Sequence, residues 1–171
     1  TRPSEGDKRK KMLSEMFAEI GENCYIEPPF HANWGGRHVH FGKEIYANFN
    51  LPLVDDTHIY VGVNTMLGPN VPVASAGHPI LPELREKAYQ YNASVHIGKN
   101  CWLGAGVIVM PGVTIEPGAI VRHAILGENS RICRNAVVGG AFGPNEKKKI
   151  SVTSKGAVVE ASTVLLPGEM L

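Results

Sequence analysis

A histidine in the longest irregular stretch of the chain is the side chain best suited to proton transfer. His78 stands in Gly77-His78-Pro79, and a charged run covers residues 83–87. Loops that project from a rigid scaffold often carry catalytic groups. An imidazole near neutral pH can take a proton from a hydroxyl nucleophile, which is the task of a general base. The alternative interpretation of His78 is an ordinary polar loop residue, and the residue types alone favour that alternative.

The residues around this stretch follow a period of six, which is neither the 3.6 of a helix nor the alternation of a strand. Segment 74–94, which contains His78, interrupts the period, and the register changes after residue 121. The apolar positions of the repeat are Phe41, Ala47, Leu53, Val61, Leu67, Val73, Ile97, Leu103, Val109, Ile115 and Val121, then Leu126, Ile132 and Val138, and finally Val152, Val158 and Val164.

Each group of six residues is interpreted as one short strand and a corner, with the apolar residue pointing inward. Three such groups close a triangular coil, and successive coils stack at the strand spacing of roughly 4.8 Å. Gly98-Lys99-Asn100 and Gly127-Glu128-Asn129 supply residues that tolerate the left-handed backbone region needed at a sharp corner. The repeat therefore predicts a mainly β protein, a parallel β-helix of hexapeptide repeats over residues 22–171, with one extended loop.

Residues 1–21 are expected to form a short N-terminal helix of the same domain. Ser4 and Asp7 resemble a capped start, and Gly21 is placed to end the helix. A stacked β-helix exposes unpaired backbone at both ends, and this helix would cover one of them. The apolar residues that fall on one helical face are Met12, Leu13, Met16, Phe17 and Ile20.

The composition favours a small ligand and a cytoplasmic protein. Seventeen Lys and Arg residues balance sixteen Asp and Glu residues, which argues against nucleic acid or an anionic membrane as the main partner. No apolar run has the length of a membrane span, and the first residues lack a signal-peptide core. The three cysteines lie far apart, so neither a disulfide framework nor a zinc knuckle is suggested.

The chain carries seven motifs between residues 3 and 121: Glu22-Asn23, Glu27-Pro28-Pro29-Phe30, Ala47-Asn48-Phe49-Asn50, Val54-Asp55-Asp56, Gly77-His78-Pro79, Ile97-Gly98-Lys99-Asn100-Cys101-Trp102-Leu103-Gly104 and Pro111-Gly112-Val113-Thr114-Ile115. Together they resemble the galactoside and maltose O-acetyltransferase family. This resemblance implies a left-handed coil and transfer of an acetyl group from acetyl-CoA to the hydroxyl of a sugar or a similar small acceptor. It also implies that His78 is the general base and that active sites form between the subunits of a homotrimer.

The resemblance also assigns five residues to the acceptor pocket. Asn48 and Asp56 match polar residues that line the pocket, while Tyr46 and Met66 match its walls. Asn33 stands where the family places another polar contact, often Asp. The alternative is structural, because Asn and Asp are common at corners in any β-helix.

Two further residues match the coenzyme site of the family. Trp102 corresponds to the residue that packs against the coenzyme, and Ala105 to a small residue that lets the pantetheine arm pass close to the backbone. A tryptophan at this point could equally be packed at a trimer contact.

A metal site is a further alternative, because some β-helix trimers are carbonic anhydrases with histidine-bound zinc. The seven histidines of this chain lack the H-x-x-x-x-H spacing of those enzymes, and no metal is expected. The histidines are His31, His38, His40, His58, His78, His96 and His123.

The last coils depart from the acetyltransferase pattern. Residues 121–132 and 152–159 are similar to the C-terminal β-helix of sugar-nucleotide pyrophosphorylases such as ADP-glucose pyrophosphorylase, which serves assembly and regulation. The sequence is therefore interpreted as two β-helix pieces joined near residues 115–121, in a natural recombinant or an engineered chimaera. Two hypotheses follow: an acetyltransferase, and a catalytically silent β-helix with a role in assembly.

Overall fold

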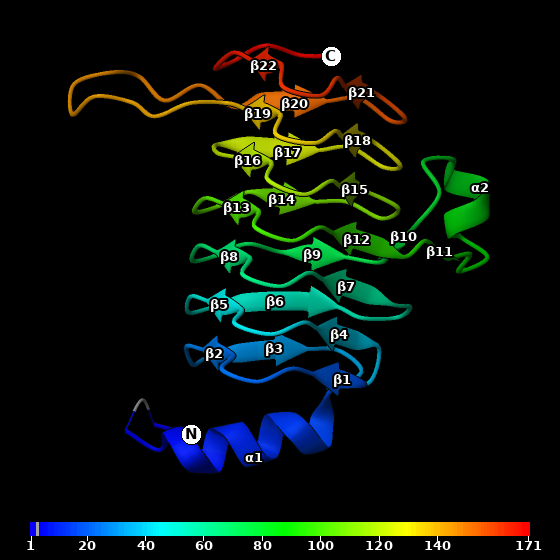
Figure 1. Ribbon diagram of the computed structural model, residues 1–171. Coiled ribbons are helices and arrows are strands. Elements are labelled where there is room, and N and C mark those ends of the chain that lie inside the picture. Colours follow the sequence, from blue (N-terminus) through cyan, green and yellow to red (C-terminus); the bar gives the residue numbers. More distant parts are fainter. Residues whose placement is uncertain (3) are drawn as a thin grey trace.

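The computed structural model describes residues 1–2 and 4–171 and consists mainly of short strands wound into stacked triangular coils (Figure 1). Three parallel sheets run the length of the stack, one on each face. The first sheet contains β1 (Glu19–Ile20), β4 (Val39–Phe41), β7 (Ile59–Val61), β12 (Val95–Ile97), β15 (Thr114–Ile115), β18 (Arg131–Ile132) and β21 (Val158–Val159).

The other two sheets complete each coil. The second sheet contains β2 (Tyr25–Ile26), β5 (Tyr46–Ala47), β8 (Met66–Leu67), β13 (Trp102–Leu103), β16 (Ile120–Val121), β19 (Val137–Val138) and β22 (Val164–Leu165). The third sheet contains β3 (Phe30–Ala32), β6 (Leu51–Val54), β9 (Val73–Ala74), β14 (Ile108–Val109), β17 (Ala124–Leu126) and β20 (Ser151–Thr153). The parallel β-helix predicted from the period of six is thus the observed architecture.

Asparagine residues form many of the corners in the left-handed backbone region. The two predicted corner residues adopt it, Asn100 with φ 55° and Asn129 with φ 56°. Asparagine tolerates this region better than most residues, because its short polar side chain can hydrogen-bond locally. The glycines of the same corners allow the backbones of successive coils to approach closely. A Cβ on Gly98 would lie only 2.7 Å from the backbone nitrogen of Pro117 in the next coil.

The interior is aliphatic and follows the predicted hexad positions through residue 138. Phe41, Leu103 and Ile132, for example, are at most 1% exposed. In the last coil the predicted register is wrong by one residue. Val158 and Val164 are 44% and 56% exposed, because Ile132 pairs with the following residue, Val159, and Val138 pairs with Leu165. The long polar loop before β20 does not follow the repeat, so counting along the sequence could not predict this shift.

The N-terminal helix α1 (Gly6–Met16) lies across the first coil (Figure 1). Its boundaries differ from the prediction: Glu5 is the N-cap residue and makes no side-chain cap, and Phe17 already has extended backbone. Leu13 and Phe17 are buried against the first two coils, and the Phe17 ring meets Phe41 of the second coil edge-on at 5.2 Å. The predicted helix end at Gly21 is wrong, because that residue already belongs to the first coil, where Gly21 N–H donates to the carbonyl of Phe41.

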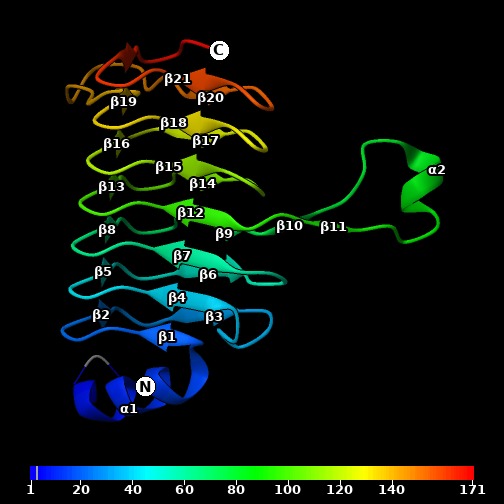
Figure 2. The ribbon, with the colours of Figure 1, turned by 45° about the vertical axis from the view of Figure 1, so that its right-hand side comes forward.

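The interruption of the repeat is a long arm that projects from the stack, as Figure 2 shows. It consists of β10 (Ala76–Gly77), α2 (Pro82–Arg85) and β11 (Tyr91–Asn92), and its two strands pair antiparallel. The arm leaves the coil between β9 of the third sheet and β12 of the first. It therefore starts at the corner opposite the second sheet.

The three sheets continue without interruption through the junction predicted near residues 115–121. β15 pairs with β18, and β16 pairs with β19, both in parallel register. The apolar interior is likewise continuous through Val121 and Leu126, both fully buried. A stack in which each coil contacts only its neighbours accommodates such a junction. The junction itself stays a prediction.

Candidate functional site

His78 lies on the arm with one ring nitrogen held and the other free. Its Nδ1 is 2.8 Å from the carbonyl oxygen of Tyr89 on the opposite side of the arm. A carbonyl oxygen can only accept, so the hydrogen bond requires the proton on Nδ1. Nε2 then carries the lone pair. The imidazole is exposed and is oriented as a base whose orienting partner is a backbone carbonyl.

A polar cluster at the base of the arm contains two of the predicted acceptor residues. Asn33 Nδ2 donates to one carboxylate oxygen of Asp56 at 2.5 Å, and Gln90 Nε2 donates to the other at 3.0 Å. The hydrogen bond from Asn33, aided by that from Gln90, lowers the pKa of Asp56 below its usual value. Asp56 is therefore a carboxylate at neutral pH, and it links the coil to the arm that carries His78.

The loop that contains Asn33 is held by a buried carboxylate. Asp55 is fully buried, and its two oxygens accept hydrogen bonds from the backbone N–H groups of Trp34 at 2.8 Å and Gly36 at 3.0 Å. Asn33 Oδ1 in turn accepts from the N–H of Asp55 at 2.8 Å. The conformation of the 33–38 loop thus depends on a residue that does not face solvent.

Replacing Asp55 with alanine is expected to lower the free energy of unfolding by about 1–3 kcal/mol per unpaired group, because two backbone N–H groups lose their acceptor. Urea denaturation measures the change. Asp55→Asn is the matched variant, since it retains one acceptor oxygen and should lose less. Equal stability of Asp55→Ala and the parent chain would contradict this account.

The other predicted residues lie on or beside the second sheet. Tyr46, Met66 and Trp102 occupy equivalent outward positions on β5, β8 and β13, and they form a row on successive coils. Met66 and Trp102 are about half exposed. Asn48 and Ala105 follow β5 and β13 at the corner between the second and third sheets. We call these five residues the outer row.

The predicted site is therefore divided in a single chain. Asn33, Asp56 and His78 belong to the corner from which the arm leaves, whereas the outer row lies on the opposite face of the triangular coil. The arm points outward, away from the stack (Figure 2). One chain therefore brings together the acceptor residues of the arm corner but not His78 and Trp102.

A groove beside Trp102 is built partly from the C-terminal coils. It has a volume of about 350 Å³. The guanidinium of Arg122 lies 5.5 Å from the centre of the Trp102 ring, and its Nε is buried with no hydrogen-bond partner among the described residues. The lining residues are Trp102, Gly104, Ala105, Arg122, His123, Ala141, Phe142 and Lys148.

Sequence reasoning missed the contributions of Gln90, Asp55, Arg122 and Lys148. Gln90 and Lys148 lie in irregular segments, where no period predicts the direction of a side chain. Asp55 belongs to one of the motifs of the family resemblance, but the sequence did not show that its carboxylate is buried and holds the neighbouring loop. Arg122 was visible as a large residue at the register change after Val121.

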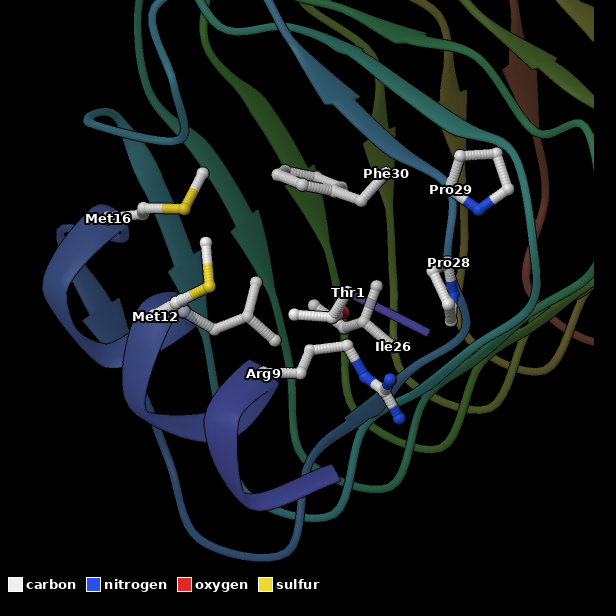
Figure 3. A pocket seen from close by; sticks show the side chains of 9 residues that line it. Thr1, Arg9, Met12, Met16, Ile26, Pro28, Pro29 and Phe30 are labelled. Atoms are coloured by element: carbon white, nitrogen blue, oxygen red, sulfur yellow. The ribbon is translucent and has the colours of Figure 1, made fainter. Parts of the chain in front are cut away.

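A separate apolar cavity of about 460 Å³ lies between α1 and the first coils (Figure 3). Met12, Met16 and Phe30 line it together with Arg9, and it contains none of the predicted site residues. Within residues 1–2 and 4–171, no cluster of three or more His, Cys, Asp or Glu side chains is arranged to hold a metal ion. Neither described helix has the length and apolar character needed to cross a membrane.

Comparisons with known proteins agree with the hexapeptide repeat and the fold. The model of the bacterial transferase hexapeptide family (six repeats) matches residues 94–124. A galactoside O-acetyltransferase of Lactococcus lactis subsp. lactis (strain IL1403) is 54% identical over 121 residues, which cover 71% of this chain and 58% of the relative. The galactoside O-acetyltransferase of Escherichia coli (strain K12) is 40% identical over 143 residues, which cover 84% and 64%. The chain thus spans less than two thirds of the length of either relative.

Solved structures give the same result. A galactoside acetyltransferase in complex with coenzyme A superimposes with a TM-score of 0.66 at 38% identity, covering 89% of this chain and 68% of that one. A maltose O-acetyltransferase from Clostridium difficile 630 superimposes with a TM-score of 0.69 at 29% identity, covering 89% and 73%. The fold is a left-handed parallel β-helix. The chain belongs to the galactoside and maltose O-acetyltransferase family of hexapeptide-repeat proteins.

Proposed function

We propose that this chain is an acetyl-CoA-dependent O-acetyltransferase that acts on a sugar or a similar small hydroxyl acceptor, with His78 as the general base. The observation that carries the proposal is the orientation of His78. Its Nδ1 donates a hydrogen bond to the Tyr89 carbonyl. The lone pair of the neutral imidazole is then on Nε2, which can accept a proton. The family membership supplies the reaction class.

In this mechanism the acetyl group passes directly from sulfur to oxygen. His78 Nε2 takes the proton of the acceptor hydroxyl while the oxygen attacks the thioester carbonyl of acetyl-CoA. The tetrahedral intermediate collapses, the carbon–sulfur bond breaks, and the CoA thiolate takes the proton from His78. The products are the O-acetyl acceptor and CoA. Throughout, Nδ1–H donates to the Tyr89 carbonyl, which stabilises the transient imidazolium.

The active site is proposed to form between two copies of the chain, because His78 and Trp102 are on opposite sides of one coil stack. Side chains near the end of the arm support this proposal. Ile80 is 91% exposed, Leu81 61% and Tyr89 54%. Exposed apolar residues on a projecting segment are typical of a docking element. The outer row of a second copy offers a matching apolar surface through Met66 and Trp102.

A contact between an arm and a different surface on the next copy is heterologous, and such contacts close into rings when the rotation allows. A homotrimer is the ring that the family resemblance implies. In such a ring each arm contributes its His78 to the outer row of the neighbouring copy. Three equivalent sites would result.

The groove beside Trp102 is proposed to hold the coenzyme. Trp102 and Ala105 line it, as the resemblance implies. Arg122 and Lys148 add two positive charges from the C-terminal coils, and cations at such a groove attract the phosphates of CoA. The C-terminal coils thus supply basic residues at the proposed coenzyme site.

A second candidate function is assembly without catalysis, and the position of Arg122 favours it. Its guanidinium covers the Trp102 ring, the surface on which the coenzyme would pack. In the assembly function this side chain stays over the ring and the coenzyme does not bind there. Isothermal titration calorimetry with CoA separates the two functions, because the assembly function predicts no heat of binding.

The Trp102→Ala variant is expected to bind CoA roughly tenfold more weakly than the parent, because the contribution of an aromatic contact is about 0.5–1.5 kcal/mol beyond its buried area. Calorimetry at fixed salt measures the dissociation constant. Tyr25→Ala, an outward aromatic of the same sheet at the N-terminal end, is the matched control. Unchanged CoA affinity in Trp102→Ala would remove the groove from the proposed site.

A further inference from the structure

A side-chain hydrogen bond joins the arm that carries His78 to the C-terminal coils. The hydroxyl of Tyr91, on β11, donates a hydrogen bond to Oε1 of Glu128. The other carboxylate oxygen of Glu128 lies 3.1 Å from Nζ of Lys155. Glu128 stands at the corner after β17, beyond the predicted junction near residues 115–121. The contact therefore joins the arm to the C-terminal coils.

The Tyr91 side chain connects this contact to the backbone next to His78. Tyr91 pairs with Gly77 across the arm, and a Cβ on Gly77 would lie 2.5 Å from the Tyr91 hydroxyl oxygen. The ring therefore lies directly over Gly77, the residue before His78. Only glycine leaves space for it, and an anchored ring restrains the backbone that leads into His78.

The pKa shifts of Tyr91 and Glu128 favour a protonated Tyr91 hydroxyl as the donor and an ionised Glu128 carboxylate as the acceptor. Burial, reinforced by the hydrogen bond and the charge of Glu128, raises the pKa of Tyr91 to about 12. The hydrogen bond from Tyr91, together with the charge of Lys155, lowers the pKa of Glu128. The contact stabilises the arm between the ordinary pKa of a glutamate and that of a tyrosine. It is lost as the pH falls through the lowered pKa of Glu128 or rises through the raised pKa of Tyr91.

We propose that Glu128 is a positioning residue for the transfer reaction, which holds the arm through Tyr91 so that His78 keeps one position. The inference rests on the proposed function for the role of His78. The anchor itself can be tested without catalysis. Gln90, which donates to Asp56 at 3.0 Å, holds the other side of the arm base, so loss of the Glu128 contact loosens the arm without releasing it.

The test uses limited trypsin digestion of the full chain, because Arg85 and Lys87 are cleavage sites on the arm. Cleavage at these sites is followed by mass spectrometry in Tyr91→Phe and Glu128→Gln. Tyr91→Phe removes the donor and keeps the ring, and it is expected to speed arm cleavage five- to tenfold. Glu128→Gln keeps an acceptor oxygen and should give a smaller increase. Cleavage at Lys147 in the exposed loop is the internal control and should not change.

The catalytic readout distinguishes positioning from general damage. Both variants should lower kcat while leaving KM for acetyl-CoA within twofold of the parent, with the loss in Tyr91→Phe exceeding that in Glu128→Gln. Arm cleavage at the parent rate would overturn the proposal, as would faster cleavage with kcat unchanged. Lack of turnover in the parent chain would contradict the proposed function, whereas the digestion result would still decide the anchor. Equal acceleration at Lys147 and on the arm would indicate unfolding and would also count against it.

Discussion

Replacing His78 with alanine is expected to lower kcat by about 10²–10⁴-fold, the usual contribution of a general base. The physical reason is that no other described side chain on the arm presents a ring nitrogen held by a carbonyl with its second nitrogen free. KM for acetyl-CoA should change little, because the imidazole acts on the acceptor hydroxyl. Release of CoA, followed with a thiol reagent over a panel of sugars, measures the rate.

His96→Asn is the matched control for this experiment. His96 is exposed on the outer face of the first sheet, where its ring stacks on Tyr60, and it takes no part in the proposed site. His78→Asn, which keeps a polar side chain of similar reach, should be as impaired as His78→Ala. A His78→Ala protein as active as the parent would eliminate the proposed mechanism.

Replacing Leu103 with alanine is expected to lower the free energy of unfolding by about 2–5 kcal/mol, the second large effect. Leu103 lies on β13, and its side chain is fully buried inside the coil, whereas the side chain of the preceding residue, Trp102, points outward. Removal of its side chain leaves a cavity between coils that are fixed by hydrogen bonds to both neighbours and cannot collapse. Urea denaturation at a fixed protein concentration measures the change, since association also contributes to the stability of an oligomer.

Val158→Ala is the control for Leu103→Ala, and it also tests the register of the last coil. Val158 points outward and is 44% exposed, so its truncation should change the free energy of unfolding by less than about 0.5 kcal/mol. Val159, the next residue, is 4% exposed and should behave as a core residue. A larger loss in Val158→Ala than in Val159→Ala would restore the register predicted from the sequence.

The contrast between these valines shows how far a repeat can be read from the sequence. Up to Val138 the apolar positions of the repeat remain recognisable on both sides of each break in the count, and those positions form the inward face. The loop at residues 139–149 separates the last coil from that count. Which valine turns inward there is decided by hydrogen bonds to the preceding coil, such as the pairing of Ile132 with Val159.

The helix and the arm show a similar limit. The apolar face of the N-terminal segment was visible in the sequence, but Phe17 leaves the helix to pack against Phe41, which ends α1 at Met16. The arm was visible as an interruption of the repeat. Its direction and its anchors on Asp56 and Glu128 were not, because they join residues far apart in sequence.

The aliphatic repeat of six residues was enough to predict a parallel β-helix and to place His78 outside it, on a long interruption. These features are local, because each coil repeats the same spacing and each corner needs the same backbone conformation. The position of the arm, at the corner opposite the sheet that contains Trp102, became known only from the folded chain. The coil stack has three faces, and only its closure determines which residues share a face. His78 is therefore directed to a second copy of the chain in the proposed function.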